Sequence, residues 1–502
     1  MTYRPHTLIP AGFVLDQSRR LAHSIAVVDA PSDDTDAVGV AVPSSGTVPE
    51  VLGLDRDALG TLRFSGAVGQ TLLIPRPDSG ALVAVGVGDP DALTAAKLRD
   101  ASAALNRTAA SAARVSFDAL RVSHAVPADA AVSAIVEGAL LARYRYDALK
   151  SAPKTVQLDR LELVGEASAA ADAAIERGTV LARAAMLTRD LAAAPPSHLT
   201  ATRFGEYALE VAPEYGVEAT VFDKQQLIEL GCGGLLGVNA GSVEEPRMIQ
   251  LRYRSQGARA HLALVGKGIT YDSGGLSLKP GDAMHASMKM DMAGAAAVLA
   301  TMFSLRALGC TNDVTAYLMC TDNLPSGSAM ALGDVLRMHG GTTVEVRNTD
   351  AEGRLVMADA IALAVEEGVD AVVDIATLTG AALRALGTLT APVFGNDQAM
   401  VDQVLAASAL TDETMWQLPL DRRYRDLLNS EVADLSNVGG ANAGATTAAL
   451  FLAEFAGDTP WAHLDIAGTM MSDRDDSWRS KGPTGFGARL LTEFALAFTP
   501  TA

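Results

Sequence analysis

Short apolar runs alternate with a helical stretch through the first 150 residues of the chain. An alanine-rich segment from about residue 91 to 113 has helical composition. The runs that we interpret as strands occupy residues 24–29, 39–42, 71–74, 81–88 and 120–123. Strands that alternate with helices are typical of an α/β domain with a largely parallel sheet.

A second alanine-rich stretch, residues 166–194, also has helical composition. It ends at Pro195 and Pro196, where a helix must stop. We therefore predict an N-terminal α/β domain at residues 1–165, a linker helix at 166–194 and a second domain at 195–502.

Four near-continuously apolar runs lie in the second domain, at residues 261–265, 314–319, 371–375 and 461–466. Such runs are expected of strands that are covered on both faces. Polar residues follow each run at once, and ligands of open α/β sheets bind outside the carboxyl ends of the strands. The chain is predicted to be of the α/β class with two α/β domains, the C-terminal one a mixed, mainly parallel sheet sandwiched by helices. Its strand ends would bring distant segments into one crevice.

Charged residues gather in two clusters of this domain, at residues 266–294 and 348–355. The acids are Asp272, Asp291, Asp350 and Glu352, and the cations are Lys267, Lys279, Lys289 and Arg354. A single acid is most often solvated surface. The sequence around these acids, however, is rich in Gly, Ala and Met rather than in the Lys and Glu of a solvated face. Buried acids must be paired or bound to metal.

The charges of the four acids would be balanced by two divalent cations, whereas without metal some of the acids would have to protonate. None of the eight histidines lies in an H-E-x-x-H or comparable pair, which disfavours a histidine-rich zinc site. Lys267 is one possible amine ligand, but it must lose its proton to bind a metal. The residues alone leave open whether Lys267 ligates a metal or pairs with an acid. Oxygen-rich ligation suits Mn, Mg, Co or Zn.

Six segments, in order along the chain, resemble motifs of the leucyl aminopeptidase family, the two-metal cytosolic aminopeptidases. They are residues 267–275, 288–292, 322–327, 348–355, 374–381 and 463–468. The resemblance runs from about Leu191 to the C-terminus, and the first 150 residues contribute almost nothing to it. In one departure, Ala293 replaces the glycine of the commoner Asp-Met-Gly-Gly, without loss of a ligand.

The resemblance implies two divalent ions per subunit, with Zn and Mn the expected metals. Asp272 and Glu352 would bridge the two ions, Lys267 and Asp291 would bind the tighter ion, and Asp350 would bind the more exchangeable one. A shared water would be acidic enough to attack the scissile carbonyl, which the same ions polarise. The free α-amino group of the substrate would bind one ion, so N-blocked peptides should fail.

Two further cations would assist. Lys279 would donate to the developing oxyanion, and Arg354 resembles the family arginine that holds a bicarbonate ion, which relays the proton of the water. A bare surface arginine is the alternative for Arg354. We interpret Lys289 as a surface or ion-pair lysine.

Six residues match the substrate-contacting positions of the family: Met288, Thr377, Leu378, Gly380, Ala467 and Met470. Apolar and flexible side chains would accept Leu or Met at the N-terminus of the substrate, with broad tolerance. For Met288 and Met470, ordinary core packing remains the alternative.

Composition limits the other possibilities. A length of 502 residues indicates two or three domains. The formal charge of −19 argues against nucleic-acid binding, because phosphate backbones would be repelled. The three cysteines, Cys232, Cys310 and Cys320, have no metal-type spacing and indicate buried free thiols in a reducing compartment. Without a signal peptide or a long apolar run, we expect a cytoplasmic protein that does not enter a membrane.

The resemblance therefore implies a cytosolic metallo-aminopeptidase acting on peptides with a free N-terminus, assembled as a homohexamer. One alternative is a metal-free descendant with a scaffold or DNA-architectural role, but such a chain should have lost a ligand or Arg354. The other is a two-metal amidase or phosphatase for small molecules. A phosphatase would need more basic residues near the site than the chain supplies.

Overall fold

The computed structural model describes residues 13–21, 23–76, 80–147 and 149–501, which fall into two compact units. The N-terminal unit extends to Met186 and includes Ser472–Gly482, and the larger unit comprises Leu187–Met471 and continues from Pro483. Helix α4 (Ala169–Ala193) carries the chain from one unit into the other and ends two residues before Pro195.

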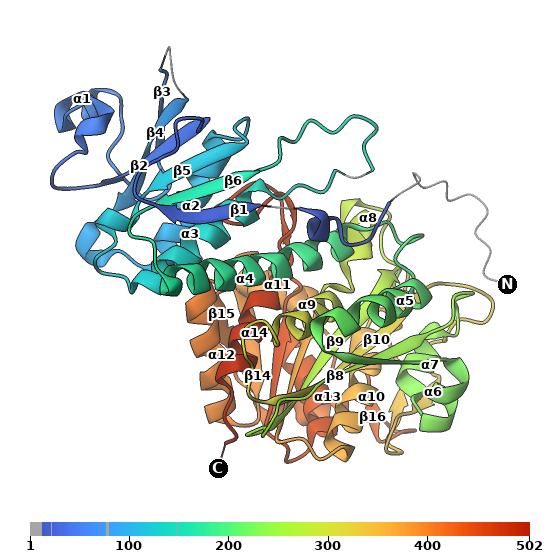
Figure 1. Cartoon of the computed structure of the whole chain (residues 1–502). Helices are drawn as coiled ribbons and strands as arrows, with labels where there is room; N and C mark the ends of the chain where they lie inside the picture. The colour runs from blue at the N-terminus through green and yellow to red at the C-terminus, as the bar shows by residue number, and fades with distance from the viewer. Residues whose placement is uncertain (1–12, 22, 77–79, 148, 502) are drawn as a thin grey trace. The chain divides into compact units, whose positions relative to one another are not determined.

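The described strands of the N-terminal unit form a six-stranded sheet in the order β1-β6-β5-β2-β4-β3 (Figure 1). Their bounds are β1 (Ser24–Val28), β2 (Ala37–Pro43), β3 (Thr71–Ile74), β4 (Ala81–Gly88), β5 (Arg114–Asp118) and β6 (Arg160–Val164). β3 pairs with β4 in antiparallel fashion, and the other described pairs are parallel. Helices α2 (Ala95–Thr108) and α3 (Ala128–Arg143) pack on each other, and α2 also packs on β4. This arrangement confirms the predicted α/β domain.

The predicted strand at residues 120–123 is wrong. Leu120–Val122 form a single 3-10 turn, and the strand lies upstream at β5, where Val115 and Phe117 are buried. Helix α2 ends at Thr108, before the predicted end at residue 113, and the residues from Arg114 onward pair with β2 and β6 as strand β5. Asp36 fixes its start by accepting a hydrogen bond from the backbone N–H of Arg114 at 2.8 Å.

Residues 472–482, here called the return segment, belong to the N-terminal unit although they lie near the other end of the chain. Trp478 is fully buried among the apolar residues of that unit. Arg107 of α2 donates to the carbonyl oxygens of Ser477 and Arg479, at 2.6 and 2.7 Å. The return segment therefore completes the core of the N-terminal unit.

The described strands of the larger unit include an eight-stranded sheet in the order β15-β14-β17-β13-β9-β10-β8-β7. Their bounds are β7 (Glu218–Phe222), β8 (Arg247–Tyr253), β9 (His261–Asp272), β10 (Asp313–Asn323), β13 (Ala371–Ala376), β14 (Ala391–Gly395), β15 (Met415–Gln417) and β17 (Trp461–Asp465). The central strands β17, β13, β9 and β10 are parallel, whereas β14, β8 and β7 pair in antiparallel fashion with their inner neighbours. The sheet is therefore mixed and mainly parallel, as predicted.

Helices cover both faces of this sheet (Figure 1). Helices α9 (Ala293–Ser304) and α14 (Ala488–Ala497) pack together on one face. On the other face, α7 (Gly233–Asn239), α10 (Gly353–Glu366) and α13 (Gly444–Ala456) share one apolar core with the strands. The three cysteines are buried free thiols, as predicted.

The four apolar runs predicted as strands are β9, β10, β13 and β17, but β9 and β10 continue beyond their predicted ends. β9 reaches Asp272 because Lys267 and its neighbours stay paired with β10. Helix α9 approaches the strands closely at Gly294, where an added Cβ would lie 2.2 Å from the carbonyl oxygen of Ile375. This approach brings Asp291, just before α9, beside Lys267 of β9.

Asp359 lies within α10 and is fully buried. Its carboxylate accepts hydrogen bonds from the backbone N–H groups of Leu235 and His339, each at 2.9 Å. Burial raises the pKa of Asp359 to about 7, although the hydrogen bonds from these two donors act to lower it. The group therefore stabilises the fold in its protonated form and costs free energy in its charged form.

The Asp359→Asn variant is expected to weaken the pH dependence of stability. Because the folded-state pKa lies above the unfolded one, near ~3.9, the contribution of Asp359 is complete below pH ~4 and lost as the pH rises through 7. The wild type should therefore lose up to about 4 kcal/mol relative to the variant across this range. Calorimetry of both proteins at pH 5 and pH 8 measures this difference. A gap in melting temperature that does not change with pH would contradict the assignment.

Candidate metal centre

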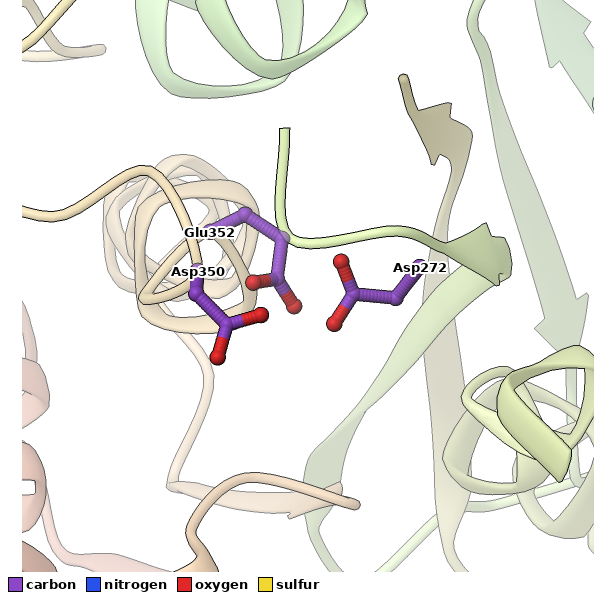
Figure 2. Close-up of side chains that lie close together, drawn as sticks. All are labelled: Asp272, Asp350 and Glu352. Atoms are coloured by element: carbon purple, nitrogen blue, oxygen red, sulfur yellow. The ribbon is translucent and has the colours of Figure 1, made fainter. Parts of the chain in front are cut away.

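Three carboxylates meet at the carboxyl end of β9 (Figure 2). Asp272 is the last residue of β9, and Asp350 and Glu352 precede α10. Oxygen atoms of the three side chains lie within 4.8 Å of one another. Asp272 and Glu352 are buried, whereas the side chain of Asp350 is 33 % exposed. Asp350 therefore marks the side of the cluster that is open to solvent.

Lys267 joins this cluster to the fourth acid. Its Nζ lies 2.8 Å from Glu352 Oε1 and 2.8 Å from Asp291 Oδ2. Lys267 also donates to the carbonyl oxygen of Thr377 at 2.9 Å, and the Thr377 hydroxyl donates to Asp291 Oδ1 at 2.6 Å. Strand β9 and the segment after β13 are thus tied at one point to the residues that precede α9 and α10.

Lys279 bridges the opposite side of the cluster. Its Nζ lies 2.8 Å from Asp272 Oδ2 and 2.5 Å from Asp350 Oδ1, and its side chain is 18 % exposed. The structure therefore brings all five residues predicted to bind metal, together with Lys279, into one connected network.

The acids of this network resist ionisation. Burial raises the pKa of Glu352 and of Asp291, and the charge of Asp272 raises both further, against the attraction of Lys267. Burial and Asp272 also raise the pKa of Asp350. For Lys267, burial acts in the opposite direction, but the combined attraction of the nearby carboxylates raises its pKa. Four ionised acids would carry more negative charge than the two lysines neutralise, and the raised pKa values reflect burial together with this excess.

The donor set fits divalent cations. Glu352 Oε2 is buried without a hydrogen-bond partner among the described residues. The four carboxylates of the network supply the oxygen ligands that Mn, Mg and Zn accept. The structure shows the ammonium of Lys267 paired with two of these acids. Ligation by the deprotonated amine stays a prediction.

Asn323 orients one of the predicted ligands, although its role is not evident from the sequence. Its Nδ2 donates to Asp272 Oδ1 at 2.9 Å and to the carbonyl oxygen of Thr349 at 3.0 Å. The position of Asn323 in a polar motif directly after an apolar run was the available signal. Its amide connects the end of β9 to the loop that carries Asp350.

Asn437 holds that same loop from the other side. Its Oδ1 accepts a hydrogen bond from the backbone N–H of Arg347 at 2.8 Å, and its Nδ2 donates to the carbonyl oxygen of Asn348 at 2.7 Å. Asn437 follows the short strand β16 (Leu435–Ser436), and nothing in the local sequence marks it. Fixing this loop fixes the spacing of Asp350 and Glu352.

Arg354 is buried in the first turn of α10, so the alternative of a bare surface arginine is wrong. It donates to the carbonyl oxygen of Asn437 at 2.9 Å, and its Nε has no hydrogen-bond partner among the described residues. Burial lowers the pKa of Arg354 to about 10, against the attraction of Glu352 and Asp465. Arg354 therefore remains a cation at neutral pH and has a donor available.

The six residues predicted to contact substrate lie on three segments. Met288 opens the 3-10 turn before Asp291, Thr377 to Gly380 connect β13 to α11 (Gly380–Leu386), and Ala467 and Met470 follow β17. The backbone N–H groups of Leu378 and Ala467 both donate to Asp465 Oδ1, at 3.1 and 3.2 Å. The second and third segments are therefore joined. Met288 and Met470 are buried, so core packing remains open for both.

Lys289, interpreted from the sequence as a surface or ion-pair lysine, is half-buried and contacts the end of a helix. Its Nζ donates to the carbonyl oxygen of Ala193, the last residue of α4, at 2.6 Å. Burial lowers the pKa of this lysine. A helix leaves its last carbonyl groups without partners, and a cation is favourable there. Lys289 thus caps α4.

Two family models match the chain. The catalytic domain of the cytosol aminopeptidase family matches residues 186–492, and the N-terminal domain of the same family matches residues 53–153. The first match contains every predicted site residue. The second shows that the resemblance, which the motifs limited to residues beyond about Leu191, extends into the N-terminal unit.

Similar proteins agree with these matches. A "probable cytosol aminopeptidase" of Alkaliphilus metalliredigens is 40 % identical over 456 residues, which are 88 % of this chain and 91 % of that protein. A protein of the same description from Streptomyces avermitilis is 43 % identical over 453 residues, 87 % of this chain and 88 % of its own. The solved structure of the bottromycin maturation enzyme BotP in complex with Mn is 37 % identical with a TM-score of 0.85, and the match covers 92 % of this chain and 99 % of that one.

A membrane-spanning helix would have to be longer and more apolar than any helix in the part of the chain that the structure describes. The family matches cover both units, and the relatives match over most of their length. The chain belongs to the cytosol aminopeptidase family and is a metal-dependent aminopeptidase, a type of hydrolase.

Proposed function

We propose that the chain is a cytosolic enzyme that removes N-terminal residues from peptides with a free α-amino group, with Leu, Met and other apolar residues preferred. The observation that carries the proposal is the network of four carboxylates around Lys267 and Lys279 at the carboxyl end of a parallel sheet. Glu352 Oε2 is a buried oxygen of this network that has no hydrogen-bond partner in the part of the chain that the structure describes. A cluster of this charge is suited to hold cations rather than to pack a core.

Two divalent ions per subunit, Mn or Zn, would be held by Lys267, Asp272, Asp291, Asp350 and Glu352. From the family resemblance, Asp272 and Glu352 would be shared ligands, and each lies beside a lysine of the network. Asp291, on the buried side beside Lys267, would serve the tighter ion, and the more exposed Asp350 the exchangeable one. When bound, such a pair supplies Lewis-acid activation of a water molecule and of the scissile carbonyl.

Two cations of the chain would assist the reaction directly. Lys279 lies on the open side of the network, where its ammonium can donate to the developing oxyanion of the substrate. Arg354 is buried, its Nε has no partner among the described residues, and it would hold a bicarbonate ion, a group that can supply a proton acceptor. Thr377 would keep Lys267 and Asp291 in place through its carbonyl and hydroxyl groups.

The side chain of the N-terminal residue would be bound by the three segments that carry Met288, Leu378, Gly380, Ala467 and Met470. Their apolar character supports a preference for Leu and Met. A neutral α-amino group would complete the ligation of one ion, which is a physical reason for action at the N-terminus only.

Metal-stripped protein that is reloaded with Mn²⁺ or Zn²⁺ is expected to release p-nitroaniline from Leu-p-nitroanilide and to leave the N-acetylated substrate intact. Acetylation removes the basic α-amine that would bind metal. The two substrates therefore differ only at the group on which exopeptidase action is proposed to depend. Absorbance of p-nitroaniline measures both reactions, with chelator-treated protein as the control.

Cleavage of the acetylated substrate at a comparable rate would contradict exopeptidase action. No cleavage with either ion, despite binding of two ions per subunit, would favour the small-molecule amidase. Absence of metal binding would favour a scaffold or DNA-architectural role.

The likeness to BotP supports a second candidate, an aminopeptidase dedicated to one peptide. BotP is described as a maturation enzyme for bottromycin. An enzyme of this kind would bind metal but would hydrolyse a panel of simple aminoacyl anilides poorly. The greater identity to proteins described as cytosol aminopeptidases favours the broader activity.

Peptides with a free N-terminus are the proposed partners, and assembly as a homohexamer is proposed from the family resemblance. Light scattering of the purified protein measures the number of subunits in the assembly. A fully active monomer would contradict the proposed hexamer. The formal charge of −19 supports the proposal that neither nucleic acid nor membrane is a partner.

A further inference from the structure

One buried carboxylate, that of Asp465, connects two of the segments that carry the predicted substrate contacts. Asp465 is the last residue of β17 and is completely buried. Its Oδ1 accepts hydrogen bonds from the backbone N–H groups of Leu378 at 3.1 Å, Thr379 at 3.3 Å and Ala467 at 3.2 Å. The carboxylate thus spans from the loop after β13 to the turn after β17.

The second carboxylate oxygen of Asp465 accepts a hydrogen bond from a threonine that caps a helix. The Thr379 hydroxyl donates to Asp465 Oδ2 at 2.7 Å and accepts a hydrogen bond from the backbone N–H of Ala382 at 3.0 Å. Thr379 is thereby the N-cap of α11, which begins at Gly380. Asp465 fixes the start of this helix as well as the loop before it.

The other end of the same loop is fixed by the metal network. Thr377 accepts a hydrogen bond from Lys267 and donates one to Asp291. Leu378 therefore lies between two anchors, the network on one side and Asp465 on the other. Its position relative to the reacting atoms depends on both.

Hydrogen bonds rather than a close ion pair surround Asp465, although Arg354 attracts it at longer range. Within the described residues no lysine or arginine forms an ion pair with it, and its partners are three backbone N–H groups and one hydroxyl. Hydrogen bonds to an ionised acceptor are shorter and stronger than neutral ones, and several on one carboxylate hold their donors in a fixed geometry. Such a carboxylate can fix the distance between the loop after β13 and the turn after β17.

We propose that Asp465 is a positioning residue that determines specificity, because it holds Leu378 and Ala467 at a fixed separation on two walls of the side-chain pocket. The inference rests on the proposed function, since it assigns a role within the same substrate pocket. Asp465 is not among the residues proposed to hold the ions or to contact the substrate. It acts through the backbone of residues that do.

The Asp465→Asn variant tests the proposal. The amide keeps the size of the side chain and an oxygen for the backbone donors. Its NH₂ group, however, faces the Thr379 hydroxyl, which already accepts a hydrogen bond from Ala382 and would lose the acceptor for its own proton. We expect the loop and the start of α11 to shift, and with them the width of the pocket.

Kinetics on the p-nitroanilides of Leu, Met, Val and Ala give the decisive readout. The ratio of kcat/KM between Leu and Ala is expected to fall about tenfold in Asp465→Asn, mainly through a higher KM for Leu, since a methylene-sized change in an apolar pocket alters discrimination by roughly this factor. The number of bound ions per subunit should stay at the wild-type value. Thr379→Val, which removes the hydroxyl, should shift the ratio in the same direction, and the double variant should add little.

Asp359→Asn is the matched control, because Asp359 is equally buried and also accepts backbone hydrogen bonds, but from Leu235 and His339, which lie outside the pocket segments. Its Leu to Ala ratio should equal that of the wild type. If Asp465→Asn does not fold, Thr379→Val carries the test alone.

A uniform fall of kcat/KM for all four substrates, with unchanged ratios, would overturn the inference and leave Asp465 a structural residue. Unchanged kinetics would overturn it as well. A wild type that hydrolyses none of the four substrates would overturn the proposed function and this inference together, so wild-type activity tells the two failures apart.

Discussion

Glu352→Gln is expected to lower kcat/KM on Leu-p-nitroanilide by at least about 10³-fold while the metal-free protein remains as stable as the wild type. Metal ions contribute several kcal/mol of transition-state stabilisation, and about 4 kcal/mol corresponds to this factor. Glu352 contacts Lys267 on one side and lies close to Asp272 and Asp350 on the other. Its loss should therefore disturb the binding of both ions. Stability should not fall, because burial already disfavours the charged form of Glu352. Steady-state kinetics, metal analysis and calorimetry measure the three quantities.

Glu366→Gln is the control for this experiment. Glu366 is the last residue of the same helix, α10, and its side chain is 72 % exposed. The control should retain wild-type activity and metal content. A Glu352→Gln protein that binds two ions and works at the wild-type rate would remove Glu352 from the ligand set.

Lys279→Met is expected to lower kcat by about 10² to 10³, the usual cost of losing one oxyanion donor. The effect should fall on kcat more than on KM, because the charge that Lys279 stabilises develops only in the transition state. Metal content should be retained or increased, since the substitution removes a cation that competes for Asp272 and Asp350. Kinetics and metal analysis of the same preparation measure both effects.

The matched control is Lys224→Met, at an exposed position that begins α6 (Lys224–Leu230). It should behave as the wild type. Loss of activity in Lys279→Met that parallels loss of bound metal would contradict a role at the oxyanion and would leave Lys279 a structural partner of the two acids.

The strands of the larger unit could be predicted because both faces of the sheet are covered. β13 and β17 are apolar almost throughout, and each lies within one residue of its predicted ends. The continuation of β9 beyond Val265 was not predictable, since Gly266 and Lys267 have no strand propensity. Pairing with β10 keeps them extended.

The charged residues of the site were predictable for a related reason, because acids in apolar, glycine-rich sequence must find partners or metal. The neutral residues Asn323 and Asn437 and the carboxylate of Asp465 were not. Their importance lies in contacts between segments that are distant in the chain, such as Asn437 with Asn348, 89 residues apart, and Asp465 with Leu378, 87 residues apart. The sequence on either side of a residue does not show which distant segments it contacts. Resemblance supplied the residue roles, and these await the experiments above.

The return segment has a consequence for biosynthesis. Trp478 and its neighbours complete the core of a unit whose other described residues end at Met186, almost 300 residues earlier in the chain. A ribosome adds about 5 to 20 residues per second, so the first unit to be made waits roughly 15 to 60 s for its last structural element. During that interval the apolar site for Trp478 is exposed on the nascent chain, where chaperones act and where aggregation begins. The N-terminal unit therefore cannot finish folding before the larger unit has been almost entirely translated.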